Sequence, residues 1–138
     1  MVSDEARHQA YVDTRYPLSA LTARIIAAAH EVHRILGPGF EEVIYQRALE
    51  KELQAESLEC AREVWIDVWY KEIEVDRKRV DFVAGDSSGD VMLEIKAKAK
   101  LDDVDLVQAL SYLKASNWRV GLLINFGSKR LEIRRLAN

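Results

Sequence analysis

The sequence predicts a mixed α/β domain in which helices pack against a central sheet. Apolar residues recur at helical spacing over residues 18–35, and this pattern stops at the Gly-Pro-Gly break of residues 37–39. Apolar residues alternate with polar ones in several stretches between residues 64 and 97, which indicates strands. The continuous apolar run 120–126 indicates a strand buried on both faces. Helices beside such strands make a layered α/β architecture.

The composition is that of an ordinary globular domain. With 138 residues, 49% of them hydrophobic and 31% charged, the chain can build one core but not two. The net charge of −3 argues against binding DNA through bulk charge alone, although basic residues gather at 77–79, 96–100 and 129–135. The net charge therefore does not decide whether the protein binds nucleic acid or another kind of partner.

Domain organisation and compartment follow from the N-terminus and the cysteine count. Residues 1–16 are polar and lack periodicity, so we expect a flexible N-terminal arm followed by a single domain over residues 17–138. No apolar run is long enough to cross a bilayer, and the N-terminus lacks the core of a signal peptide. Cys60 is the single cysteine, which excludes an internal disulfide and a four-cysteine metal site. We expect a cytoplasmic protein that does not contact membranes.

The first half of the domain is predicted to form two helices and a strand. The second helix begins near Phe40, and it carries Glu42 and Tyr45 on one face because three residues separate them. A strand follows at residues 64–69, where apolar and other residues alternate. Residues 70–80 read as a turn that leads into the next strand.

Two short strands joined by a turn are predicted within residues 79–97. The turn GDSSGD has the residue types that tolerate tight backbone geometry, so antiparallel pairing is expected. In the first strand, Val80, Phe82 and Ala84 are expected on one face and Asp81 on the other. The alternation therefore predicts a sheet with one apolar face and one face that carries charged residues.

A third helix and two further strands complete the prediction. Asp102 or Asp103 is in position to cap the helix, and Gln108 and Tyr112 lie one turn apart on it. The apolar run after it is the buried strand, and residues 131–136 alternate as an edge strand would. The leucines expected to face the sheet from this helix are Leu106, Leu110 and Leu113.

Charged residues on the two short strands form the candidate site. Pairing of the strands would bring Asp81 near Glu94, and Lys96 lies two residues beyond Glu94 on the same face. Two carboxylates and an ammonium flanked by apolar residues are costly to bury unless they bind something. A divalent metal ion fits this requirement best.

Two interpretations of this set compete. Carboxylates on adjacent strands can bind Mg²⁺ or Mn²⁺, and a bound metal activates water and neutralises a phosphoryl oxygen, as phosphodiester hydrolysis needs. Lys96 could then orient the attacking water or stabilise the transition state, while Glu42 adds a carboxylate and Gln108 positions water or phosphate. The alternative is a structural ion pair on an exposed face, which the bare Asp…Glu-x-Lys spacing alone would favour.

The joint pattern resembles a known family. The stretch GFEEVIY at residues 39–45 is a GxxExxY string, and with Asp81, the Glu94-Ile95-Lys96 triplet, a Gln-x-x-x-Tyr element and the ending GLLINFGSKRLEIRRL it is similar to the GxxExxY family of small bacterial and archaeal proteins. That family is placed in the PD-(D/E)xK nuclease superfamily. The resemblance covers residues 18–136, and the Gln-x-x-x-Tyr element is also similar to RecB-type nucleases.

The resemblance implies a restriction-endonuclease-like core, an α/β fold with a mixed central sheet flanked by helices. It also implies that the protein binds Mg²⁺ or Mn²⁺ and cleaves DNA. By position, Glu42, Asp81 and Glu94 match the metal-binding acids, Lys96 matches the catalytic lysine, and Gln108 belongs to the helix that follows. We therefore expect a metal-dependent deoxyribonuclease with these five residues as its catalytic set.

Other residues and functions have competing interpretations. Tyr112, Tyr45 and His33 are candidate supporting residues, although Tyr45 is expected to pack or to orient Glu42, and His33 could equally lie at the edge of the core. The tryptophans could stack on bases, but packing in a core or an interface is the simpler expectation. The alternative function is a catalytically silent module that binds nucleic acid or protein with the same fold, and either form could be a homodimer.

Overall fold

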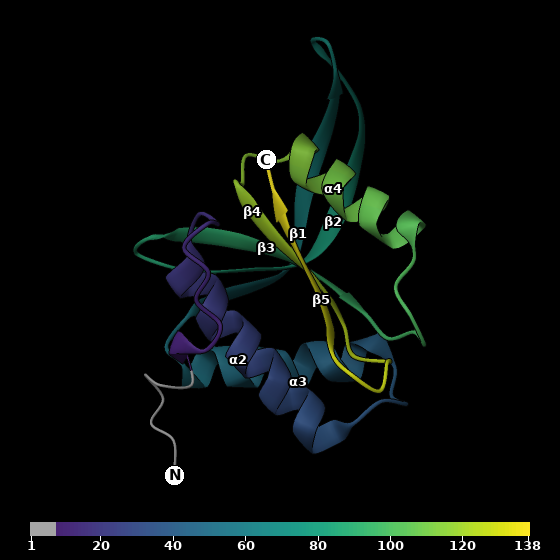
Figure 1. Ribbon diagram of the computed structural model, residues 1–138. Helices are drawn as coiled ribbons and strands as arrows, with labels where there is room; N and C mark the ends of the chain where they lie inside the picture. The colour runs from purple at the N-terminus through teal and green to yellow at the C-terminus, as the bar shows by residue number, and fades with distance from the viewer. Residues whose placement is uncertain (1–7) are drawn as a thin grey trace.

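The computed structural model describes residues 8–138, which form one sheet with helices on both faces (Figure 1). The elements are α2 (Ser19–Leu36), α3 (Glu42–Ala55), β1 (Glu59–Tyr70), β2 (Ile73–Asp86), β3 (Gly89–Lys96), α4 (Asp103–Ala115), β4 (Val120–Asn125) and β5 (Glu132–Ala137). The strand order is β1-β2-β3-β4-β5, and every neighbouring pair is antiparallel except β3 and β4. Helix α4 makes the crossover that a parallel pair requires. The predicted α/β class with a mixed, helix-flanked sheet is confirmed.

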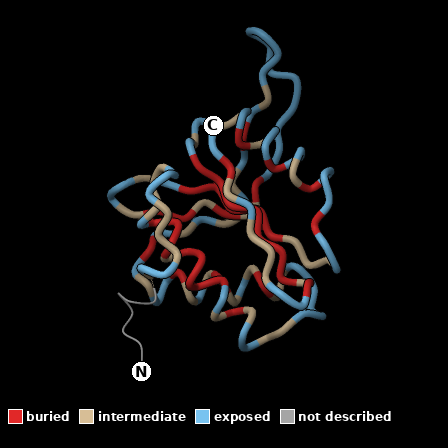
Figure 2. The backbone as a smooth tube through the Cα atoms, viewed as in Figure 1, coloured by how far each residue is buried: buried red, intermediate tan, exposed pale blue. Residues whose placement is uncertain are grey.

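Apolar side chains fill the space on each face of the sheet. Helices α2 and α3 pack on one face, where Ile25, Tyr45 and Phe82 belong to one buried cluster. Helix α4 covers the other face, where Met92 and Leu113 belong to a second cluster. Every residue of β4 is buried, as its continuous apolar run predicted, and Figure 2 shows this strand within the red centre of the molecule.

Strands β1 and β2 form a long hairpin that projects beyond the rest of the sheet (Figure 1). The predicted turn over residues 70–80 is wrong, because the chain reverses at 71–72 and β2 already begins at Ile73. Residues 73–79 are all exposed (Figure 2), and the apolar alternation in this stretch ends at Val75, because charged residues occupy positions 76–79. The large apolar side chains exposed on this hairpin are Trp65, Trp69, Tyr70, Ile73 and Val75.

Strand β2 separates from β3 at Asp81. Pairing with β3 begins at Phe82, opposite Leu93, whereas pairing with β1 continues outward along the hairpin. The β1–β2 ladder also skips the position of Asp81, where Glu63 on β1 has a left-handed backbone with φ of 56°. Val80 therefore packs in the cluster under α4, while Phe82 packs under α2 and α3. The prediction that these two share a face is wrong, because the alternation is interrupted where the ladder breaks.

Helix α4 turns a different face to the sheet than the leucine spacing predicted. Its first turn is a capping box in which Asp102 and Asp105 each accept a backbone N–H of the other at 3.0 Å, so of the two predicted caps, Asp102 and Asp103, the structure uses Asp102. The helix buries Asp105 and Leu113, and Leu110 is 40% exposed. The prediction for Leu110 is wrong, because the face of α4 that packs inward carries Asp105, Ala109 and Leu113, and Asp105 pairs there with Lys98 at 2.9 Å.

Residues 8–16 lie against α2 and β5. The ring of Tyr11 stacks on His30 with 5.0 Å between centroids, and Arg135 Nη2 donates to the Tyr11 carbonyl at 2.7 Å. The expected flexible arm, residues 1–16, falls partly outside the described residues, and from His8 onward the described part contacts the domain. Within the described residues, no helix is both long and apolar enough to cross a bilayer.

Asn125, at the end of β4, is fully buried and organises the segment that follows β3. Its Oδ1 accepts the N–H groups of Lys98 and Gly127 at 3.0 and 3.1 Å, and its Nδ2 donates to Lys98 O and Glu132 at 2.9 Å. Asn125→Ala leaves these buried groups unpaired, so we expect it to lower the free energy of unfolding by about 3 kcal/mol, measured by urea unfolding. The exposed Asn117→Ala serves as control, and a similar loss in both variants would contradict this role.

Candidate active site

The two strand carboxylates meet where β2 leaves β3. Glu94 Oε1 accepts the backbone N–H of Asp81 at 3.2 Å, and Asp81 Oδ2 accepts the N–H of Ile95 at 2.7 Å. The two carboxylates thus accept hydrogen bonds from backbone N–H groups that have no partner strand where the regular β2–β3 ladder stops. The predicted proximity of Asp81 and Glu94 is confirmed.

Burial makes this acid pair costly to ionise. Glu94 is 4% exposed, and its burial, followed by the charge of Asp81, raises its pKa to about 8. Burial also raises the pKa of Asp81, although the N–H of Ile95 and the charge of Lys96 oppose that shift. The pair therefore favours either a shared proton or a positive ion.

A lysine and a glutamine stand beside the acid pair. Lys96 follows Glu94 by two residues in β3 and so shares its face, and its charge lowers the pKa values of Asp81 and Glu94. Lys96 Nζ donates to Gln108 Oε1 at 3.2 Å, from the second turn of α4. The structure brings these predicted residues together although they come from three different elements.

Glu42 supplies a third carboxylate near the pair. It is the first residue of α3 and is exposed, but partial desolvation by its neighbours raises its pKa, while the charge of Lys96 opposes this shift and that of Asp81 adds to it. These interactions place Glu42 within electrostatic reach of the strand residues. The helix start thus faces the same site as β2 and β3.

Tyr45 holds the turn that leads into α3. Its hydroxyl donates to the Gly37 carbonyl at 2.6 Å and accepts the Phe40 N–H at 3.1 Å, and its ring stacks on Phe126 with centroids 4.9 Å apart. Tyr45 is fully buried. This packing fits the expectation that Tyr45 positions the turn before Glu42 rather than taking part in chemistry.

Two candidate supporting residues make their contacts elsewhere. His33 Nε2 donates to the Ser128 carbonyl at 2.9 Å, which ties α2 to the loop before β5. Tyr112 packs, partly buried, against the cluster under α4. Within residues 8–138, neither side chain has a hydrogen bond to the acid pair. The core-edge interpretation of His33 agrees with this arrangement.

Sequence reasoning missed three polar residues at the border of the site. Arg62 Nη2 donates to Gln46 Oε1 at 3.0 Å, and the charge of Arg62 lowers the pKa of Asp81. The charge of Asp105 acts on Glu42. Gln46 lies four residues after Glu42, so helical spacing could have identified it, whereas nothing local marks the other two.

The chemistry of the acid pair fits a divalent cation with few protein ligands. Among residues 8–138, no three His, Cys, Asp or Glu side chains gather closely enough to form a complete metal cage. Mg²⁺ is commonly held by one or two carboxylates, with water and substrate phosphate completing the shell. Asp81 and Glu94 satisfy that requirement, and the buried charge they share is what such an ion would neutralise.

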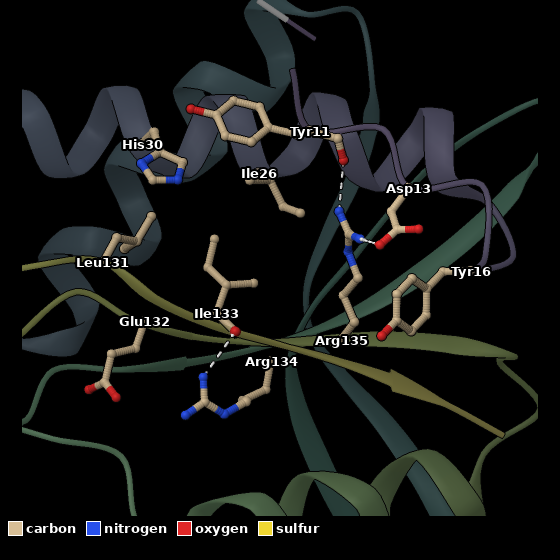
Figure 3. Close-up of a pocket in the computed structure, with 10 residues that line it drawn as sticks. All are labelled: Tyr11, Asp13, Tyr16, Ile26, His30, Leu131, Glu132, Ile133, Arg134 and Arg135. Carbon is tan, nitrogen blue, oxygen red and sulfur yellow. Dashed lines mark hydrogen bonds and ion pairs between the residues drawn. The ribbon is translucent and has the colours of Figure 1, made fainter. Parts of the chain in front are cut away.

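A cavity of about 640 Å³ lies away from these residues, between residues 8–16, α2 and β5 (Figure 3). Tyr11, His30 and Ile133 are among the residues that line it, and none of the predicted site residues does. Figure 3 shows Arg135 reaching from β5 to Asp13 and to the Tyr11 carbonyl. The wall of this cavity is thus held by its own contacts, independently of the acid pair.

A mixed sheet whose neighbouring strands present Asp and Glu-x-Lys where they diverge, with helices on both faces, is a restriction-endonuclease-like architecture. Residues 19–136 match the family model of the PD-(D/E)XK nuclease superfamily. The chain therefore belongs to that superfamily, whose members are generally nucleases and typically use divalent metals. The comparison with curated proteins gave no match.

Proposed function

We propose that this protein is a metal-dependent deoxyribonuclease that hydrolyses phosphodiester bonds in DNA. The observation that carries the proposal is the pair formed by the half-buried Asp81 and the buried Glu94, with the Lys96 ammonium beside it. Two buried carboxylates are costly unless a cation compensates them, and phosphodiester hydrolysis needs a cation at the phosphoryl oxygen. Membership of the superfamily supports a nucleic acid as substrate.

We also infer that the chain belongs to the GxxExxY group. Each of the three named positions has a physical role here. Gly39 has φ of 118°, a conformation that disfavours other residues. Glu42 lies within electrostatic reach of the acid pair, and Tyr45 holds the turn before Glu42 through its hydrogen bonds to Gly37 and Phe40. The motif thus describes a turn built to present one carboxylate.

In this proposal Asp81 and Glu94 hold Mg²⁺ or Mn²⁺, and Glu42 contributes through a water molecule bound to the ion. When bound, such an ion lowers the pKa of water and neutralises charge on a phosphoryl oxygen. The Lys96 ammonium orients the attacking water or stabilises the charge that develops on the phosphate. Gln108 accepts a hydrogen bond from Lys96 and so acts as a positioning residue.

DNA cleavage with and without metal tests the proposal. We expect the purified protein to cut single- or double-stranded DNA only when Mg²⁺ or Mn²⁺ is supplied, and Asp81→Asn to lower the rate at least about 100-fold. Asparagine keeps an oxygen for the Ile95 N–H but loses the charge. The exposed Asp90→Asn is the matched control in the same pair of strands. Equal cleavage by all three proteins would refute the assigned roles.

The exposed hairpin favours a second candidate, a catalytically silent module that binds protein or nucleic acid. Trp65 and Trp69 are 52% and 58% exposed, and such aromatic surface is typical of interfaces. Calorimetry separates the two candidates. Metal binding that Asp81→Asn abolishes supports the enzyme, whereas tight binding of DNA or a protein without metal binding supports the module. Sedimentation shows whether that protein is a second copy.

A further inference from the structure

Arg62 and Gln46 form a polar pair at the border of the candidate site. Arg62 lies in β1 opposite Phe82, the residue that follows Asp81. Gln46 follows Glu42 by four residues in α3, so the two side chains share a helix face. The Arg62 guanidinium donates to the Gln46 amide oxygen at 3.0 Å. The pair therefore lies between α3 and the point where β2 leaves β3.

The Arg62 guanidinium is fixed in place without being neutralised. It lies 5.7 Å from the centroid of the Phe82 ring, and its Nε is buried with no acceptor among residues 8–138. No ion pair joins it to a carboxylate in that part of the chain, and the amide of Gln46 carries no charge. Its charge reaches Asp81 only at longer range, so a bound anion would supply the direct charge partner that this partly buried cation lacks within residues 8–138.

A second cation of the candidate site is held in the same way. Lys96 is also held by a neutral amide, that of Gln108. The neighbouring Lys98 differs, because it pairs with Asp102 and Asp105 at 3.1 and 2.9 Å and is therefore neutralised. Arg62 and Lys96 thus both lie within electrostatic reach of Asp81, and neither forms a direct ion pair among residues 8–138 as Lys98 does.

We propose that Arg62, held by Gln46, binds a non-bridging oxygen of a DNA phosphate next to the one that is cleaved. This subsite rests on the proposed nuclease function, and it places the strand to be cut between two amide-held cations, Arg62 and Lys96. A guanidinium matches the geometry of phosphate oxygens, and contacts of this kind position a nucleic acid without reading its sequence. Arg62 therefore contributes to affinity for any DNA sequence.

Binding of a fluorescent oligonucleotide in EDTA tests the subsite without cleavage. In fluorescence anisotropy at increasing KCl, we expect Arg62→Met to raise Kd about 10-fold and to reduce the slope of log Kd against log salt by about one. Arg15→Met is the matched control, because it removes the same charge from an exposed ion pair with Asp13. We expect that control to change Kd less than about 2-fold.

A second variant separates phosphate binding from a structural role. Gln46→Glu keeps an acceptor for Arg62 but adds a carboxylate that neutralises it, so we expect the protein to remain folded and Kd to rise about as much as in Arg62→Met. Gln54→Glu adds the same charge two turns further along α3, at an exposed position, and should change Kd less than about 2-fold. Thermal unfolding of each variant verifies that it is folded.

Three outcomes distinguish the failures. If Arg62→Met binds like Arg15→Met, or Gln46→Glu like Gln54→Glu, the subsite is refuted and the nuclease assignment stands. If the wild type binds through Arg62 but never cuts DNA with any divalent metal, the nuclease assignment is refuted and the phosphate contact stands. If the wild type binds no oligonucleotide in EDTA at any KCl concentration, the subsite is refuted, and if it also cuts no DNA with any divalent metal, both are refuted.

Discussion

Replacing Lys96 with methionine lowers the rate of DNA cleavage by about 10²- to 10³-fold and leaves the protein folded. Methionine retains most of the apolar stem but removes the ammonium beside Asp81 and Glu94. Loss of one preorganised charge at a reacting group typically costs this much in rate. The measurement is kcat on a short DNA at saturating metal, with Lys114→Met, an exposed lysine of the last turn of α4, as control. Equal losses in both variants would contradict a role for Lys96.

The Gln108 side chain is expected to act through Lys96. Gln108→Leu removes the acceptor of the Lys96 ammonium, and we expect a smaller loss of about 10-fold because the charge itself remains. In the double variant, the loss should equal that of Lys96→Met alone. Multiplied losses would instead mean that Gln108 contacts water or phosphate independently.

Without metal, the free energy of unfolding falls as pH rises from about 4.5 to about 8. The pKa of Glu94 is about 8 in the folded protein, against 4.5 ordinarily, because burial and then the Asp81 charge penalise its ionised form. Over this range the folded chain keeps a proton that the unfolded chain has lost. Glu94 therefore costs no stability below pH 4.5. Between pH 4.5 and pH 8 its effect lowers the free energy of unfolding by about 3–5 kcal/mol.

Urea unfolding in EDTA at pH 5 and pH 8 measures this loss. Glu94→Gln carries no titrating group at that position, so we expect it to be more stable than the wild type at pH 8 and to depend less on pH. The exposed Glu59→Gln is the control and should follow the wild type. A wild type whose stability is unchanged or higher at pH 8 would contradict the buried acid pair.

The central residues of the candidate site were predictable because their signal is local. Strand alternation placed Glu94 and Lys96 on one face, and the turn between the strands predicted the pairing that brings Asp81 to Glu94. Residue type then limits the chemistry, since buried carboxylates beside an amine need a proton or a cation. What this site does remains a prediction that the experiments above address.

The errors lie where distant parts of the chain meet. Leu110 has the spacing of a core residue, but α4 turns Asp105, Ala109 and Leu113 inward, and Asp105 pairs with Lys98 of a different segment. Val80 has the alternation of its strand, but the ladder breaks beside it at Asp81. A pattern of residues that are close in sequence contains no information on the contacts that orient α4 or on the break in the strand ladder.

The sequence alone predicted the order of helices and strands, the end of α2 and the cap of α4. It also identified the acidic residues and the lysine of the candidate site. These depend on backbone preferences and on spacing along a few residues, which a linear pattern contains. The fold in three dimensions was needed for the divergence of β2 from β3, the buried network of Asn125 and the pairing of Arg62 with Gln46. Each of these features depends on contacts between residues that are distant in sequence. The burial and the electrostatic interactions that stabilise these contacts exist only once the helices have packed on the sheet.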